Sequence, residues 1–125
     1  MTTPTMILIV DDHVDSADVL GLVMKMNFPD TAVLVNYAGP QAIDSATRQR
    51  PDVALLDMEM PEMDGEALAQ RLRSLYPGAA PLLIALSGNL ERLEQAMGNG
   101  SFDRCMSKPV DLDALTRMVQ QRLGG

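Results

Sequence analysis

The sequence is poor in cysteine, in tryptophan and in aromatic residues as a whole. Its 125 residues include one cysteine, no tryptophan and only 3% aromatic residues. A single cysteine excludes an internal disulfide bond, and the scarcity of aromatic rings predicts an aliphatic core. Ten methionines are expected to fill gaps in such a core because the thioether side chain is flexible.

The sequence also lacks segments that would direct a chain into or across a membrane. No apolar run approaches the roughly 20 residues that span a bilayer, and the first residues lack the charged and then apolar order of a signal peptide. We therefore expect a cytoplasmic protein. Its 10 Lys and Arg against 17 Asp and Glu give a formal charge of -7, which would repel nucleic acid and anionic membranes. A metal ion or a cationic group is a better partner.

Segments typical of strands and helices alternate five times along the chain. Short apolar runs predict strands at residues 6–10, 31–37, 53–56, 81–86 and 102–106. Helical spacing predicts helices at residues 14–26, 40–48, 67–75, 90–97 and 112–123. We expect Val14 on the buried stripe of the first helix and Asp111 as the N-cap of the last. The alternation predicts a single α/β domain over residues 1–125, a parallel sheet with helices on both faces.

Four of the predicted strands are followed closely by polar residues that are able to do chemistry. Asp11 and Asp12 follow the first strand, Asp57 follows the third and Ser87 follows the fourth. Lys108 comes shortly after the fifth. Because the carboxyl ends of parallel strands meet at one edge of a sheet, we expect these five side chains to lie close together.

The three acids of this group predict a magnesium site. Crowded carboxylates repel one another unless a cation lies among them, and Mg²⁺ prefers oxygen ligands. A carboxylate such as that of Asp57, beside Mg²⁺, is able to attack a phosphoryl group and form an aspartyl phosphate. Lys108 would bind one oxygen of that group, Ser87 a second, and backbone N–H groups after Asp57 a third.

Each of these residues has a simpler interpretation when it is taken alone. Asp11 and Asp12 would be helix N-caps, Ser87 a turn residue and Lys108 a solvated surface charge. An acid pair, an acid, a hydroxyl and a Lys-Pro pair at four strand ends is a demanding coincidence, and it favours the phosphoacceptor interpretation.

The same residues resemble the motifs of the response-regulator receiver domain, the phosphoacceptor half of two-component signalling. The match covers essentially the whole chain. It includes the acid pair, the block LLDMEMPEMDG around Asp57, Ser87 before Gly88, and Lys108 before Pro109. The resemblance implies a flavodoxin-like (CheY-like) doubly wound sheet of five parallel strands in the order 2-1-3-4-5.

The resemblance also implies a role for each site residue. Asp57 would be the phosphoacceptor, and Mg²⁺ would be held by Asp12, Asp57 and the backbone carbonyl of Glu59, with Asp11 assisting. A histidine kinase or a histidine phosphotransfer domain would donate the phosphate, and the domain would catalyse only its own phosphorylation and hydrolysis. Because no DNA-binding output segment is present in these residues, we expect a downstream effector protein, or another part of a longer chain, to bind the face of the fourth helix, fifth strand and fifth helix.

Position 105 departs from the family pattern. Receiver domains usually carry Tyr or Phe three residues before the lysine, and the ring moves inward when the Ser or Thr hydroxyl turns toward phosphate. This chain has Cys105 there, and neither Tyr37 nor Tyr76 lies on the matching strand. We expect Cys105 to be a small buried apolar residue and the conformational response to be muted or differently wired.

Alternative functions remain open from the sequence. The domain would also suit a hybrid histidine kinase or a phosphate sink. Cys105 mildly favours a binding module that acts without phosphorylation. A Mg²⁺-dependent phosphohydrolase acting in trans is opposed by the adjacent acids Asp11 and Asp12, which lack the D-x-D spacing of such enzymes, and by a length that leaves no room for a cap over the substrate.

Residues beside the predicted site are expected to have lesser roles. The side chains of Glu59 and Asn89 would overhang the phosphoryl group and tune its lifetime. His13, the only histidine, is expected at the surface. Three methionines after the third strand are expected to pack rather than to bind a metal: Met58, Met60 and Met63.

Overall fold

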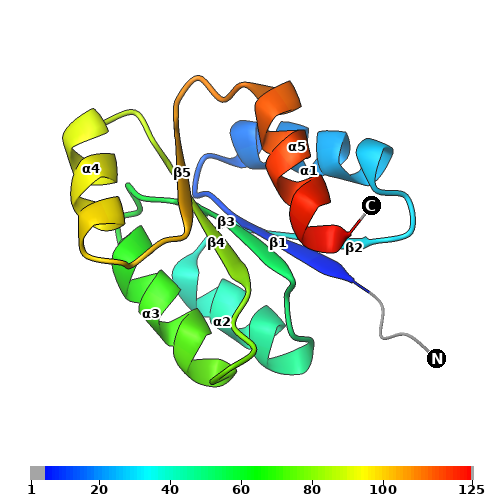
Figure 1. Ribbon diagram of the computed structural model, residues 1–125, viewed down its shortest axis with the longest axis horizontal. Helices are drawn as coiled ribbons and strands as arrows, with labels where there is room; N and C mark the ends of the chain where they lie inside the picture. Colours follow the sequence, from blue (N-terminus) through cyan, green and yellow to red (C-terminus); the bar gives the residue numbers. More distant parts are fainter. Residues whose placement is uncertain (1–4, 125) are drawn as a thin grey trace.

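The computed structural model describes residues 5–124 and shows strands and helices alternating five times (Figure 1). The strands are β1 (Met6–Val10), β2 (Ala32–Asn36), β3 (Val53–Asp57), β4 (Leu82–Ser87) and β5 (Arg104–Ser107). The helices are α1 (Val14–Asn27), α2 (Gly39–Arg48), α3 (Gly65–Leu75), α4 (Leu90–Gly98) and α5 (Leu112–Leu123). Every predicted element is confirmed, although β5 begins at Arg104 rather than at 102 and α3 begins at Gly65 rather than at 67.

The five strands form one parallel sheet in the order β2-β1-β3-β4-β5, which confirms the flavodoxin-like, CheY-like fold. In β1, Ile9 pairs with Val35 of β2 on one side and with Leu55 of β3 on the other. Every residue of β1 and β3 is buried, as expected for strands with helices on both faces. Because the strands run in one direction, their carboxyl ends meet at the same edge of the sheet.

Helices cover both faces of the sheet, so alternate residues of each strand enter different cores. Met6, Leu8 and Val10 of β1 pack with residues of α2, α3 and α4. Ile7 and Ile9 pack with residues of α1 and α5. Figure 1 shows α1 and α5 above the sheet, with α2 and α3 below it. The strand ends therefore lie between two layers of helices.

Helix α1 buries only one stripe of its surface. Ala17, Leu20 and Met24 are buried against the sheet, whereas Val14 is 49% exposed. The expectation that Val14 belongs to the buried stripe is wrong: Val14 is the first residue of α1, and burial of the helix begins only at Ala17. Other exposed apolar residues of α1 are Val19, Leu22 and Met26. Even so, none of the helices within residues 5–124 has the length and apolar character needed to cross a membrane.

Gly65 allows α3 to begin directly beside the end of β3. A Cβ atom at Gly65 would lie 2.9 Å from the backbone oxygen of Asp57 and 3.0 Å from the Cα of Met58. These are backbone atoms, which cannot swing aside as a flexible side chain would, so the approach requires glycine. Asp64 caps the helix by accepting a hydrogen bond from the N–H of Ala67 at 2.8 Å. The loop after Asp57 is therefore held at both ends.

Gly65→Ala is expected to lower the free energy of unfolding by about 1–3 kcal/mol, because the added methyl group must displace packed backbone. Gly98→Ala is the matched control, since Gly98 ends α4 and a Cβ atom there meets nothing within 4 Å. That variant should be as stable as wild type or more stable by less than about 1 kcal/mol, because Ala favours a helix. Urea unfolding measures both. Equal stability of Gly65→Ala and wild type would contradict the close approach.

Candidate functional site

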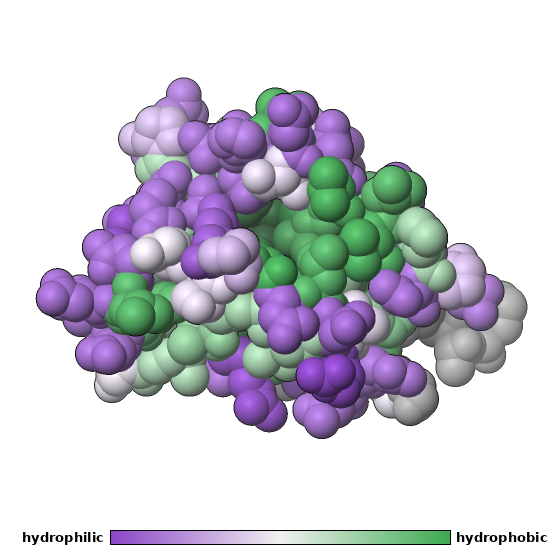
Figure 2. Space-filling model, turned by 90° about the horizontal axis from the view of Figure 1, so that it is seen from above, coloured by the Kyte–Doolittle hydropathy of each residue, from purple (hydrophilic) through white to green (hydrophobic). Residues whose placement is uncertain are grey.

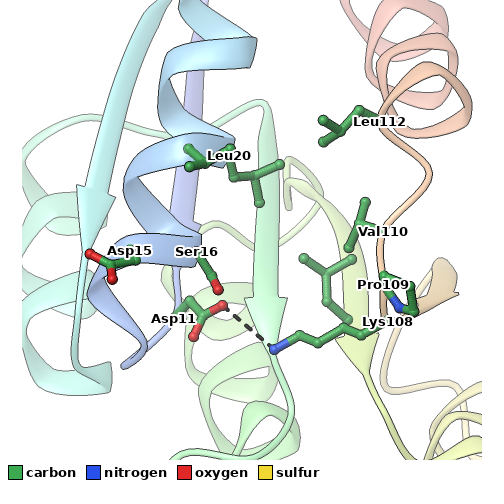
Figure 3. Close-up of a pocket in the computed structure, with 10 residues that line it drawn as sticks. Asp11, Asp15, Ser16, Leu20, Lys108, Pro109, Val110 and Leu112 are labelled. Carbon is green, nitrogen blue, oxygen red and sulfur yellow. Dashed lines mark ion pairs between the residues drawn. The ribbon is translucent and has the colours of Figure 1, made fainter.

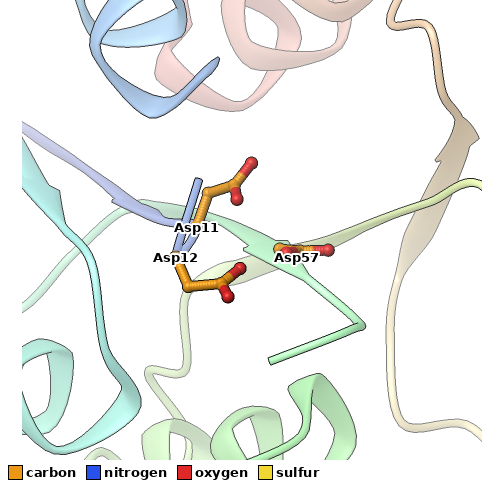
Figure 4. A group of neighbouring side chains, drawn as sticks. All are labelled: Asp11, Asp12 and Asp57. Carbon is orange, nitrogen blue, oxygen red and sulfur yellow. The ribbon is translucent and has the colours of Figure 1, made fainter. Parts of the chain in front are cut away.

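Three carboxylates gather at the carboxyl edge of the sheet (Figure 4). Asp11 and Asp12 follow β1, and Asp57 ends the neighbouring strand β3. One oxygen of each carboxylate lies within 4.8 Å of the other two. Asp11 and Asp57 are both 3% exposed, whereas Asp12 is open to solvent. The structure thus brings together the three acids that the sequence predicted to lie close to one another.

Lys108 brings a positive charge to these acids. Its Nζ lies 3.2 Å from Oδ1 of Asp57 and 3.5 Å from Oδ2 of Asp11, and Figure 3 shows the pair with Asp11. The backbone N–H of Lys108 donates to the carbonyl oxygen of Ser87 at 2.9 Å, which keeps the lysine beside the end of β4. Burial disfavours the charged ammonium, but the carboxylates of Asp57 and Asp11 outweigh burial and raise the pKa of Lys108.

Burial raises the pKa of Asp57 to about 7, from an ordinary value of 3.8. The backbone N–H of Glu59, 3.1 Å from Oδ1, opposes that rise, the negative charge of Asp11 adds to it, and the Lys108 ammonium opposes it. Near neutral pH the Asp57 carboxyl is therefore only partly ionised. A divalent cation bound beside it would favour the carboxylate form.

The donor set fits Mg²⁺. Carboxylate oxygens are hard ligands, and Mg²⁺ is typically held by one or two carboxylates together with water and substrate phosphate oxygens. Asp11, Asp12 and Asp57 supply oxygens at a spacing that one ion can bridge. Their combined charge exceeds that of the Lys108 ammonium, so a divalent cation would relieve repulsion among them.

Ser87, at the end of β4, is fully buried. Its Oγ accepts a hydrogen bond from the N–H of Asn89 at 3.0 Å and donates one to the carboxylate of Glu59. The Glu59 side chain thus bridges the loop after β3 to the end of β4, a contact that the sequence did not predict. Metal binding by the Glu59 backbone carbonyl and phosphoryl binding by Ser87 stay predictions.

Asn89 has a structural role beside the site. It is the N-cap of α4, and its Oδ1 accepts a hydrogen bond from the N–H of Arg92 at 3.2 Å. Such a cap satisfies a backbone N–H that has no partner within the helix. The side-chain oxygen expected to overhang the phosphoryl group is therefore engaged in capping. An effect of Asn89 on phosphoryl lifetime stays a prediction.

The other residues that the sequence singled out lie outside the acidic group. His13 is exposed, with Nδ1 3.1 Å from Oγ of Ser16, which confirms a surface histidine. Cys105 is half-buried and packs at the margin of a core, so it is less buried than expected. The three methionines after β3 pack in or against the core, as predicted: Met58, Met60 and Met63.

Asn36, at the end of β2, was not identified from the sequence. Its side chain is buried, and its Oδ1 accepts a hydrogen bond from Oγ of Ser45 at 3.0 Å. Its backbone carbonyl accepts the N–H of Asp11 at 3.1 Å, so Asn36 helps to place one of the acids. Within residues 5–124, its Nδ2 is the one buried side-chain nitrogen or oxygen without a hydrogen-bond partner. A polar residue that ends an apolar run is the signal that could have identified it.

The fold and the acidic edge together define a class of protein. It is a doubly wound α/β domain with an acidic site at the carboxyl ends of β1 and β3, where ligands of such sheets bind. The family model for the response regulator receiver domain matches residues 7–120. The chain therefore belongs to the response regulator receiver domain family, as its motifs suggested. Receiver domains are signalling modules of two-component systems, and they work with histidine kinases and effector proteins.

Comparisons with known proteins agree with this assignment. Sporulation initiation phosphotransferase F of Bacillus subtilis is 31% identical over 117 residues, which cover 94% of this chain and 92% of that protein. A receiver domain of a sensor histidine kinase from Pseudomonas aeruginosa, solved with magnesium coordinated in its active site cleft, is 27% identical. Its TM-score is 0.83, and the match covers 98% of this chain and 100% of that one. The signal receiver domain of a DNA binding response regulator from Colwellia psychrerythraea is 28% identical with a TM-score of 0.86, over 97% and 99% of the two chains.

Asp57→Asn is expected to change how stability depends on pH in metal-free buffer. The folded-state pKa of Asp57, about 7, lies above the ordinary value of 3.8, so folding favours the protonated carboxyl. Its stabilising contribution is complete below pH 3.8 and is lost as the pH rises through 7. The stability of Asp57→Asn relative to wild type should therefore increase by about 2 kcal/mol between pH 5 and pH 8.

Urea unfolding at several pH values measures this difference. Glu62→Gln is the control, because Glu62 is an exposed acid of the same loop and should leave the pH dependence of wild type unchanged. Parallel stability curves for wild type and Asp57→Asn would contradict the raised pKa. Added Mg²⁺ should stabilise wild type at pH 8 and have little effect on Asp57→Asn, because the ion binds the folded state.

Proposed function

We propose that the chain is the phosphoacceptor of a two-component phosphorelay, with Asp57 phosphorylated in a Mg²⁺-dependent reaction. The observation that supports this most directly is the environment of one carboxylate. Asp57 Oδ1 lies 3.2 Å from Lys108 Nζ, and the Asp57 carboxylate also shares metal-binding spacing with Asp11 and Asp12. The site thus combines a nucleophile, Asp57, with carboxylate ligands for a cation and the positive charge of Lys108. Residues 1–125 would form one receiver domain.

In the proposed reaction, an oxygen of Asp57 bonds to phosphorus as the bond from phosphorus to a histidine nitrogen of the donor breaks. The nitrogen keeps the electron pair of the broken bond. Mg²⁺ would be held by Asp11, Asp12, Asp57 and the backbone carbonyl of Glu59, and it would neutralise charge on the phosphoryl oxygens. Attack by water on phosphorus later restores the Asp57 carboxylate and releases phosphate. The domain would catalyse these two steps on itself and on no separate substrate.

Lys108 and Ser87 would bind the phosphoryl group once it is attached. Lys108 already contacts the Asp57 oxygen at 3.2 Å, so its ammonium is placed to pair with a phosphoryl oxygen. The Ser87 hydroxyl would donate a hydrogen bond to another. Phosphorylation adds about one to two negative charges at Asp57. It favours the conformation in which the Lys108 ammonium and the Ser87 hydroxyl lie nearest to the phosphoryl oxygens.

An effector protein would bind the face formed by α4, β5 and α5. A hollow of about 330 Å³ lies between α4 and β5, and Leu90 is 64% exposed beside it. Cys105 lines this hollow at the position where receiver domains usually carry an aromatic ring. A small side chain leaves room there for an apolar side chain of a partner, which supports a protein-binding output.

The phosphodonor, a histidine kinase or a histidine phosphotransfer domain, would approach between α1 and α5. A groove of about 400 Å³ lies there, with Asp11 and Lys108 among its lining residues. Figure 2 shows the hollow and the apolar surface that borders it, and Figure 3 shows Leu20 and Val110 at the groove. Val19, also at the groove, is 56% exposed. An apolar surface next to the phosphoacceptor site suits a partner that must deliver a phosphoryl group to it.

Two related functions would use the same chemistry. One is a receiver domain within a hybrid histidine kinase, which the similarity to a receiver domain of a sensor histidine kinase supports. The other is a phosphate sink, which accepts phosphate without a change at the α4, β5 and α5 face. A binding module that acts without phosphorylation would not require an intact acidic site.

Incubation with Mg²⁺ and a small acyl phosphate should add the mass of one phosphoryl group to wild type and to Glu62→Gln, and none to Asp57→Asn. Chelation of Mg²⁺ should slow the reaction of wild type by at least about tenfold, because the ion stabilises the transition state. Intact mass spectrometry measures both results. A phosphorylated Asp57→Asn variant, or a wild type that never gains mass, would contradict the proposal. Amide NMR shifts confined to the site would indicate a phosphate sink instead of a switch.

Val19→Asp should impair transfer from a phosphorylated histidine phosphotransfer domain about tenfold or more, because it places a charge in the apolar surface that the donor would cover. Its reaction with a small acyl phosphate should match that of wild type. Gln70→Asp adds the same charge on α3, on the other side of the sheet, and should leave both reactions unchanged. The rates of phosphoryl transfer from each donor test this. Equal slowing with both donors would mean that Val19→Asp disturbs the site itself.

A further inference from the structure

We infer that Glu59 is a positioning residue that holds Ser87 away from the phosphoryl group until phosphorylation displaces it. This inference rests on the proposed function, in which Ser87 binds the phosphoryl group on Asp57. Glu59 belongs to the loop after β3, and Ser87 ends β4, the neighbouring strand. The hydrogen bond between their side chains joins the two segments that flank the phosphoacceptor.

The Ser87 hydroxyl has only one proton to donate. That proton is directed to a carboxylate oxygen of Glu59, while the N–H of Asn89 occupies an acceptor position of Oγ at 3.0 Å. The carbonyl oxygen of Asn89 is 3.5 Å away, which is long for a hydroxyl donor. A phosphoryl oxygen is therefore able to receive the Ser87 hydrogen bond only after the bond to Glu59 has broken.

Phosphorylation of Asp57 would favour breaking of the hydrogen bond between Ser87 and Glu59. The backbone N–H of Glu59 lies 3.1 Å from Oδ1 of Asp57, so Glu59 is adjacent to the group that becomes phosphorylated. The new negative charges repel the Glu59 carboxylate and compete with it for the Ser87 proton. Lys108 lies beside Asp57, so its positive charge would attract the phosphoryl oxygens and help to hold the phosphoryl group near Ser87. Glu59 is exposed, so its side chain is able to turn into water at little cost.

Glu59 therefore disfavours phosphorylation. In the unphosphorylated protein, the hydrogen bond from Ser87 to Glu59 stabilises an orientation of Ser87 in which its hydroxyl cannot donate to a phosphoryl oxygen. That stabilisation is lost when the phosphoryl group forms. A hydrogen bond to a charged acceptor is among the stronger ones in proteins. Its loss should therefore raise the rate of phosphorylation by roughly tenfold.

Variants of Glu59 separate the hydrogen bond from the charge. Glu59→Asp keeps the charge but is one methylene shorter, so it should not reach Ser87. Glu59→Gln keeps the reach and loses the charge. Phosphorylation by a small acyl phosphate with Mg²⁺, followed by intact mass, should be about tenfold faster for Glu59→Asp and Glu59→Ala and intermediate for Glu59→Gln. Glu62→Gln, in the same loop, should match wild type. A Glu59→Asp variant as slow as wild type would overturn the inference.

The Ser87→Ala background tests whether Glu59 acts through Ser87. Without the hydroxyl there is no hydrogen bond to break, so Glu59→Asp should change the rate by less than about twofold in that background. The same tenfold gain with and without Ser87 would show that Glu59 acts by charge alone and would overturn the inference.

Urea unfolding of the unphosphorylated variants distinguishes failure of the inference from failure of the proposed function. Glu59→Ala and Ser87→Ala should each lower the midpoint, and the double variant should lower it less than the sum of the two. Additive losses would overturn the inference even if Asp57 is phosphorylated. A wild type that gains no phosphoryl group would overturn the proposed function, and a non-additive result would then still show the bond between Glu59 and Ser87.

Discussion

The sharing of one ammonium group among crowded carboxylates is the interaction on which the site depends. Asp11 and Asp57 are nearly inaccessible to solvent, and both lie within salt-bridge distance of Lys108. Removal of that ammonium would raise the pKa of Asp57 further, because its positive charge would no longer offset the negative charge of Asp11. Even with the ammonium present, burial raises the pKa of Asp57 to about 7. Near neutral pH the Asp57 carboxyl is therefore only partly ionised, and a bound divalent cation would favour its carboxylate form.

The parallel sheet brings the carboxylates close together and also prevents them from separating. β1 and β3 are neighbours and are buried along their whole length, so the acids that follow them cannot move apart without unfolding the core. Gly65 brings α3 against the backbone of Asp57 and Met58, and the N–H of Lys108 is bound to the carbonyl of Ser87. Backbone contacts thus fix the points from which the charged side chains project. Their protonation and their hydrogen-bond partners are what remain free to change.

The strands and helices, and the gathering of acids and a lysine at one edge of the sheet, could be predicted from the sequence, because both depend on local patterns. A carboxylate such as Asp57 at the end of an apolar run marks a strand and a site at once. The strand order came from the family resemblance, since alternation of strands and helices permits other orders. The exposure of Val14 and the contact between Glu59 and Ser87 could not be predicted, because each depends on how a side chain meets residues distant in sequence. Asn36 is recognisable as a polar residue at the end of an apolar run, but an amide side chain by itself does not indicate metal binding or phosphoryl transfer.

The acidic site remains connected to α4 even though Cys105 replaces the usual aromatic residue. Ser87 Oγ accepts the N–H of Asn89, and Asn89 caps α4 by accepting the N–H of Arg92. If Ser87 turns toward a phosphoryl group, as proposed, the first of these bonds would weaken, and the second would connect that change to the first turn of the helix. An aromatic ring transmits such a change by packing, which requires space for the ring. In this chain the half-buried Cys105 leaves a hollow beside α4, and hydrogen bonds from Ser87 through Asn89 provide the continuous link between the acidic edge and the helix.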